Sequence, residues 1–166
     1  MNNSQRLASL DRILANVPKF DCRPGCSDCC GPVIMSRLEM KRICERTGKP
    51  EDELDFMTVL ASEDQICPLL DRQTHRCTVY DIRPAICKVF GASLHKRLVC
   101  PHGCAPPAPL SAKATDDLID ESKRLGHGFP AHSHALPSMM LTDPDFGSKA
   151  GQPAPNTFSV LKQQTA

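Results

Sequence analysis

Large aromatic side chains are scarce in this sequence, whose 166 residues include six Phe, one Tyr and no Trp. Aromatic residues supply much of the apolar area that a small domain buries, so this chain has little large apolar surface from which to build a core. The length fits a single domain. We therefore expect bound metal to provide part of the stability that the core cannot.

The sequence also has no run of eighteen apolar residues, and residues 1–17 lack the basic and apolar stretches of a secretory signal. We expect a cytoplasmic location and no membrane contact. The formal net charge is +1, without a basic stripe interleaved with aromatic residues, which argues against a nucleic-acid partner. The basic residues between Arg37 and Lys49 are predicted to form the solvated face of a helix. The expected partners are a metal ion or cluster and a protein.

Cysteine, in contrast, is abundant: all ten cysteines lie between residues 22 and 104. Cys22, Cys26, Cys29 and Cys30 fall within one short stretch. In a reducing compartment such a density favours metal ligation over disulfides, and adjacent cysteines such as Cys29 and Cys30 rarely form a relaxed disulfide. A secreted disulfide scaffold is the alternative.

Three segments can be distinguished along the chain. Residues 1–19 are expected to form an amphipathic helix that packs on the core, because four apolar residues recur at intervals of three or four before Pro18. Residues 20–104 form the cysteine-cluster metal-binding domain. Residues 105–166 contain no cysteine and eight of the fifteen prolines, and we expect a Pro-rich tail with one helix near 111–125 and an otherwise irregular course.

Within the middle segment, Ser36 and Glu39 form a capping box that predicts a helix over 37–47, ended by Gly48. Residues 67–70 and 77–80 are β-prone and are separated by a polar stretch, which predicts a small hairpin. A short helix beginning near Pro84 would carry Cys87. The fold class expected is a small, mainly α domain with one short β-hairpin, organised by metal and followed by an irregular C-terminal tail.

The spacing of the cysteines indicates how they could bind metal. Cys26 and Cys29 form a C-x2-C loop, which lets two sulfurs bind one centre, and Cys22 can extend it. Consecutive side chains diverge, so Cys29 and Cys30 are expected to serve different centres, or one of them packs instead. The spacing from Cys22 to Cys29 also matches the radical S-adenosylmethionine loop, but Asp28 replaces the usual aromatic residue and the chain is too short for the barrel.

Four motifs then occur in order: the opening cysteines, Cys67-Pro68-Leu69-Leu70, Cys77-Thr78-Val79-Tyr80, and Arg83-Pro84-Ala85-Ile86-Cys87-Lys88-Val89-Phe90. Over residues 20–91 this pattern resembles the YkgJ-type cysteine-cluster (CxxCxxCC) family of zinc- or iron-chelating domains. Glu39 stands where that family tends to have an acidic residue. The first cysteine spacing, Ser27 and Lys88 depart from the family pattern. The resemblance implies metal binding and only weakly implies a reaction. Larger relatives, the flagellin lysine methylases, join such a cluster to methyl transfer, but no Gly-rich cofactor loop is obvious here.

Three cysteines lie outside those motifs. Cys44, on the helix capped by Ser36, is expected to be a small buried hydrophobic residue. Cys100 and Cys104 are a C-x3-C pair around turn residues, either an auxiliary ligand pair or a turn without metal. Arg83 is predicted to donate N–H groups to the sulfur ligands or to a carboxylate. Tyr80 is expected in the core.

The function predicted is metal binding, through an iron–sulfur cluster of the 4Fe–4S type or through Zn²⁺. Iron–sulfur is favoured because the shared motifs contain no histidine. A structural or regulatory zinc module is one alternative, and a small metalloenzyme or methyltransferase-associated iron–sulfur protein is another. Arg83 is expected beside the cofactor, and the predicted metal ligands are Cys22, Cys26, Cys29, Cys30, Cys67, Cys77, Cys87, Cys100 and Cys104.

Overall fold

The computed structural model describes residues 1–129. This part of the chain contains six α-helices, one 3₁₀ helix and two short strands. In chain order they are α1 (Asn3–Leu14), α2 (Arg37–Thr47), α3 (Glu51–Leu54), α4 (Phe56–Ala61), β1 (Leu70–Asp71), β2 (Arg76–Cys77), η1 (Tyr80–Ile82), α5 (Ala85–Val89) and α6 (Ala112–Leu125). None of these helices is long and apolar enough to cross a membrane. The mainly helical fold with one hairpin is the class expected from the sequence.

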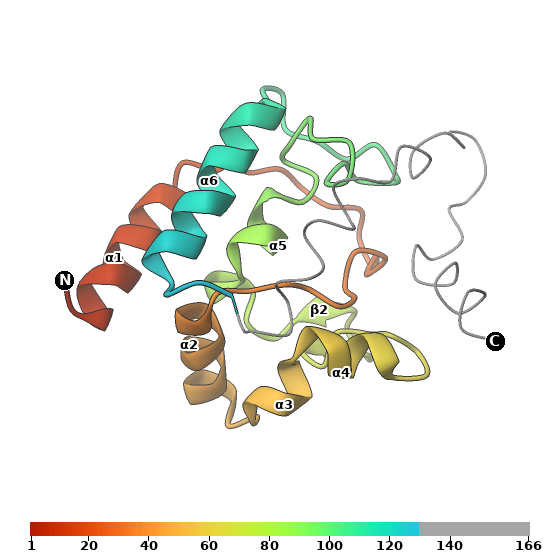
Figure 1. Ribbon diagram of the computed structural model, residues 1–166. Helices are drawn as coiled ribbons and strands as arrows, with labels where there is room; N and C mark the ends of the chain where they lie inside the picture. The colour runs from red at the N-terminus through yellow and green to blue at the C-terminus, as the bar shows by residue number, and fades with distance from the viewer. Residues whose placement is uncertain (130–166) are drawn as a thin grey trace.

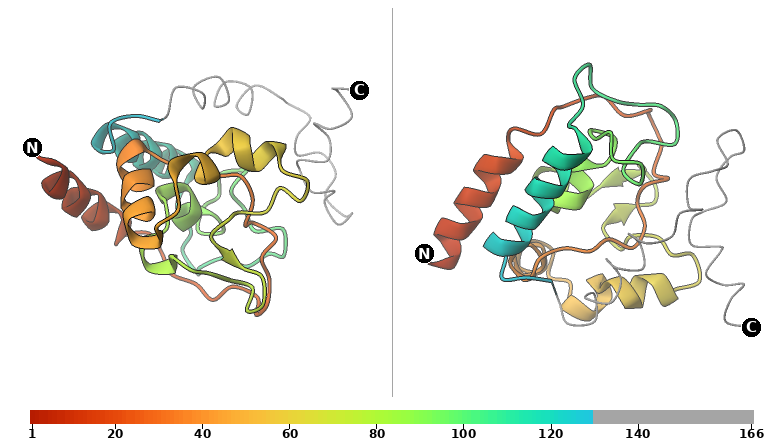
Figure 2. Two further views of the ribbon diagram at one scale, coloured as in Figure 1. Left: turned by 90° about the horizontal axis from the view of Figure 1, so that it is seen from below. Right: turned by 45° about the horizontal axis from the view of Figure 1, so that its top comes forward.

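The helices form two groups (Figures 1 and 2). In both figures α1 and α6 lie side by side, and α6 also contacts α5. Helices α2, α3 and α4 follow one another along another side of the molecule, and α2 joins the two groups through its contact with α1. The antiparallel hairpin pairs Leu70 with Cys77 and Asp71 with Arg76. A long segment without helix or strand, residues 18–35, runs from α1 to α2.

Each group of helices has its own hydrophobic cluster. The first is built around Leu10, Leu14, Val89 and Leu125, and the second around Ile43, Leu69 and other aliphatic and Met side chains. Phe56 is the one buried aromatic residue within residues 1–129. The core is therefore divided and almost entirely aliphatic, as the composition predicted.

Helix α2 has the bounds that its capping signals predicted, and Gly48 ends it in the left-handed region with φ 72°. The hairpin is shorter than expected, and Tyr80 falls in η1. The expectation that Tyr80 is core was wrong, because the residue is 58% exposed. Its ring covers the guanidinium of Arg83 instead, with the Arg83 Cζ 3.7 Å from the ring centre.

Helix α6 is part of the packed structure. Ser111 caps it by accepting a hydrogen bond from Ala114 N at 3.1 Å, and Leu125 belongs to the first hydrophobic cluster. Residues after α6 also accept hydrogen bonds from the backbone N–H groups at the start of α2. Arg37 N donates to Gly128 O at 3.0 Å and Leu38 N to Gly126 O at 3.1 Å. The part of the predicted 105–166 tail from residue 130 onward, which includes His132 and His134, lies outside the described residues.

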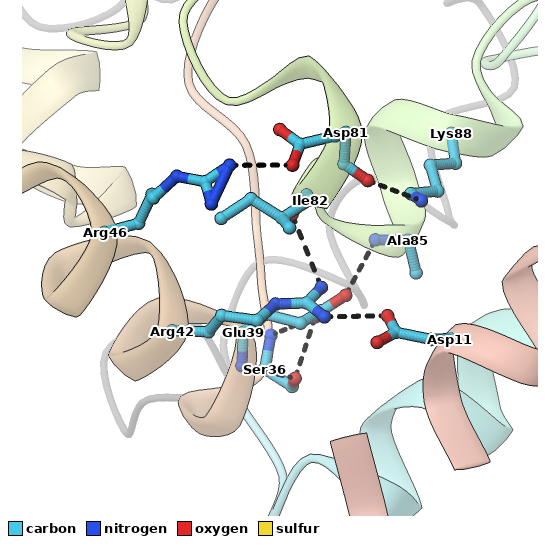
Figure 3. Close-up of polar contacts among 9 residues, drawn as sticks. All are labelled: Asp11, Ser36, Glu39, Arg42, Arg46, Asp81, Ile82, Ala85 and Lys88. Carbon is cyan, nitrogen blue, oxygen red and sulfur yellow. Dashed lines mark hydrogen bonds and ion pairs between the residues drawn. The ribbon is translucent and has the colours of Figure 1, made fainter. Parts of the chain in front are cut away.

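Glu39 links the two helix groups through buried hydrogen bonds (Figure 3). Its Oε2 accepts bonds from Ser36 N at 2.9 Å and from Ser36 Oγ at 2.7 Å, as the capping box predicted. Its Oε1 accepts a bond from Ala85 N at 2.8 Å, at the start of α5. The side chain is 1% exposed, so water cannot replace these bonds. Glu39 therefore fixes the position of α5, the helix that carries Cys87.

Arg42 holds the same junction from another side. Its Nη1 lies 2.7 Å from Asp11 Oδ1, its Nη2 donates to Ile82 O at 3.4 Å, and its side chain is 14% exposed. The prediction of a wholly solvated basic face on α2 was therefore wrong for Arg42. No local pattern around Arg42 indicates the distant partners that draw this residue inward.

Replacing Glu39 by Gln should destabilise the fold by about 2 kcal/mol or more, because an amide group cannot accept bonds on both sides and would leave a buried N–H unpaired. Glu45→Gln, on the exposed side of the same helix, is the matched control and should change the free energy of unfolding by less than about 0.5 kcal/mol. Denaturant unfolding measures both. Equal losses in the two variants would show that the link from Glu39 to α5 is unimportant.

Candidate metal centre

The loop that carries the first four cysteines is folded by two consecutive turns. Cys26 N donates to Arg23 O at 3.2 Å, and Cys30 N donates to Ser27 O at 2.8 Å. Gly25 lies in the first of these turns with φ 71°, a conformation that glycine adopts without strain. Cys67 N then donates to Cys30 O at 3.1 Å, which ties the loop to the segment before the hairpin. Residues 37 positions apart are thereby brought together.

Five thiols gather where this loop, the hairpin and α5 meet. We call them the inner thiol group: Cys29, Cys30, Cys67, Cys77 and Cys87. The neighbouring Cys30 thiol is the largest cause of the raised pKa of Cys29. The turn from Ser27 to Cys30 allows the two side chains to lie close, because divergence of consecutive side chains holds for regular strands and helices. Whether the two thiols serve one centre or two stays a prediction.

Burial and mutual proximity both suppress ionisation in this group. Burial raises the pKa of Cys67, of Cys77 and of Cys87, and in each case the nearby Cys29 thiol adds to the increase. The pKa of Cys87 is also raised by Cys67 and Cys77. Without a cation these thiols are protonated near neutral pH, so a metal that binds them must displace their protons.

Arg83 is a cation whose charge acts on the inner thiol group. It lowers the pKa of Cys29, Cys77 and Cys87 against the effect of burial. Its Nε is buried and has no hydrogen-bond partner within residues 1–129. An N–H group buried beside thiols without an oxygen acceptor is suited to a sulfur acceptor. This orphaned donor and the all-sulfur ligand set fit a thiolate-bound metal or an iron–sulfur cluster.

A second set of thiols lies at the outer end of the same loop. We call Cys22, Cys26, Cys100 and Cys104 the outer thiol group. Burial raises the pKa of Cys22, followed by the effects of Cys29, Cys100, Cys26 and Cys104, so these sulfurs are neighbours. Burial raises the pKa of Cys100, and the nearby Cys104 thiol adds to the increase. The C-x3-C pair thus faces the cysteine loop, and Cys29 stands between the two groups.

Two further residues at the outer group were not predicted as site residues. Asp28 Oδ2 lies 2.6 Å from His102 Nε2, and both have an atom close to the Cys26 sulfur. His102 could have been suspected from its place between Cys100 and Cys104. Nothing in the sequence connects it with Asp28, because 74 positions separate them.

Cys44 and His127 lie apart from both groups. Cys44, on α2, packs against the second hydrophobic cluster, and burial raises its pKa. His127 Nε2 lies 3.0 Å from Asn3 Oδ1. All ten cysteines fall within the described residues and none is in a disulfide. Which of the thiols bind metal remains a prediction.

Comparison with known proteins identifies the chain's family. The model of the cysteine-cluster family CxxCxxCC, described as "Putative zinc- or iron-chelating domain", matches residues 21–105, just over half of the chain. The match extends past residue 91, where the sequence motifs ended, and so includes Cys100 and Cys104. No curated protein and no solved structure matches the chain. The protein belongs to the CxxCxxCC family, whose domain is associated with zinc or iron chelation.

Proposed function

We propose that this protein holds an iron–sulfur cluster, with the 4Fe–4S type as the first expectation, in the inner thiol group. The observation that carries the proposal is the proximity of thiols from three separate segments, three of which, Cys29, Cys77 and Cys87, also lie within reach of the Arg83 charge. Four cysteine thiolates suffice for such a cluster. The fifth thiol allows ligand exchange during cluster assembly or transfer.

The inner thiol group favours iron–sulfur over zinc, because all five of its members are cysteines. Asp81 is a carboxylate whose charge acts on Cys77. Zinc bound by four cysteines is the alternative, and it would make the domain a structural or regulatory module. The two alternatives can be distinguished by colour and redox activity, both of which an iron–sulfur protein has.

Arg83 has two roles in this proposal. Its charge offsets part of the negative charge that four thiolates bring, and its orphaned Nε–H is available to a sulfur of the centre. Tyr80 holds the guanidinium on its other side through a cation–π contact. Glu39 supports this arrangement at a distance, since it anchors the residue two positions after Arg83.

The proposed role is electron transfer or cluster delivery to a protein partner, in a reducing compartment such as the cytoplasm, where free thiols persist. An enzymatic role would need an open coordination position beside a substrate pocket. A hollow lined in part by Cys26 borders the outer thiol group. At the inner thiol group we favour electron or cluster transfer, because its excess of thiols suits ligand exchange.

Serine substitutions should separate ligands from bystanders. Replacing Cys29, Cys67, Cys77 or Cys87 should lower iron per folded monomer and bleach the visible absorption, because a hydroxyl is a poor substitute for a thiolate. Cys44→Ser is the matched control and should do neither, beyond a packing cost of about 1 kcal/mol. Metal analysis and spectra of anaerobically purified variants test this.

Two results would count against this assignment. If Cys44 proved indispensable while Cys67, Cys77 and Cys87 were silent, the inner thiol group would not be the centre. A colourless protein with about one zinc and no iron would keep the thiol group and replace the cluster by the zinc alternative.

Arg83→Met should weaken metal binding at pH 7 by about tenfold or more, the usual range for a group that supports metal ligands. Removing the cation raises the pKa of Cys29, Cys77 and Cys87 further, so protons compete better with metal. Raising the pH ionises the thiols and should therefore reduce the deficit. Arg72→Met, which removes an exposed cation paired with Asp64, is the control. A deficit independent of pH would indicate that Arg83 acts only in packing.

A further inference from the structure

Three different metal-binding side chains meet at the outer end of the cysteine loop. One ligand atom from each of Cys26, Asp28 and His102 lies within 4.8 Å of the other two. Cys26 and Asp28 come from the loop, and His102 comes from the turn between Cys100 and Cys104. The meeting of a thiol, a carboxylate and an imidazole from distant segments is more specific than a cluster of one residue type.

The backbone holds these three side chains in place. Gly25 and Gly103 both adopt positive φ, 71° and 72°, at the turns that present Cys26 and His102. Gly103 N donates to Cys100 O at 3.0 Å, which closes the second turn. The two glycines form the turns, and Cys26 and His102 beside them supply the ligand atoms.

A surface hollow gives a cation access to these residues. It is lined by Arg23, Pro24, Gly25, Cys26, Asp28 and His102. The Asp28 side chain is 59% exposed and that of His102 is 29% exposed, so a hydrated cation can reach both.

We propose that Cys26, Asp28 and His102 form a second metal site, which binds a divalent cation of the zinc type independently of the inner centre. Sulfur, nitrogen and oxygen are all common zinc ligands, whereas the inner group offers sulfur alone. Three protein ligands leave a fourth position for water or an incoming group. Such an exposed and incomplete site binds metal reversibly.

An ion pair between Asp28 and His102 is the simpler explanation for part of this arrangement. Their 2.6 Å contact needs only a shared proton, and it accounts for two of the three groups. It does not account for the Cys26 sulfur beside them. A bound cation would replace that proton. Arg23, which lines the hollow, is positively charged and would repel the cation.

The test is calorimetric titration of Zn²⁺ into the full-length protein, purified without oxygen with its inner metal in place. The wild type should bind one additional Zn²⁺. His102→Ala and Asp28→Asn should each weaken this binding by about tenfold or more, with the inner metal content unchanged. His75→Ala is the matched control, because its imidazole also contacts this loop, with Nδ1 3.2 Å from Ser27 Oγ, yet lies outside the proposed ligand set.

Three outcomes would overturn the site: no additional Zn²⁺ in the wild type, unchanged affinity in His102→Ala, or loss of the inner metal together with the added Zn²⁺ in that variant. The last would mean one centre and not two. The identity of the inner metal is measured separately, so a failure of the iron–sulfur proposal is distinguishable from a failure of this one.

Discussion

Thiols that lie close together and are partly withdrawn from water cannot all ionise unless positive charge is supplied. The inner thiol group meets this constraint in part through Arg83, whose charge acts on Cys29, Cys77 and Cys87. One guanidinium cannot balance four thiolates. In the proposed centre the rest of the charge would come from a metal, so the arrangement that makes these residues poor acids is also one that a bound metal would stabilise.

The surrounding fold serves to bring the three thiol-bearing segments to one place. The backbone bond from Cys67 to Cys30 joins the loop to the hairpin segment, and Glu39 fixes the start of α5 behind Cys87. The two hydrophobic clusters are aliphatic and separate, so neither alone connects all three segments. Metal–sulfur bonds across the segments would provide the connection that a larger aromatic core provides in other small domains.

Local signals in the sequence were sufficient for much of the fold. The capping box at Ser36 and Glu39, the cap at Ser111 and the glycines that follow α2 and α6 each specify a helix end through bonds within a few residues. Contacts between distant residues could not be obtained in this way. The second oxygen of Glu39 bonds to Ala85, and Arg42 turns toward Asp11, because tertiary packing places these groups opposite one another.

The candidate site was likewise only partly predictable from the sequence. The cysteines and Arg83 could be named from spacing and from family resemblance. Their division into an inner and an outer group could not, since it depends on how the loop folds back at Gly25 and on where the turn at Gly103 lies. Asp28 and His102 were missed for that reason, because only the folded chain brings them beside Cys26.

The central claim is that metal bound by the inner thiol group holds the segments of this fold together. Thermal unfolding of the reduced protein, with and without metal, tests it most directly, provided that metal analysis verifies the metal-free state. We expect the metal-free protein to lose its cooperative transition, because the divided aliphatic core alone does not join the cysteine loop to the hairpin and α5. An unchanged transition midpoint in the metal-free protein would contradict the claim.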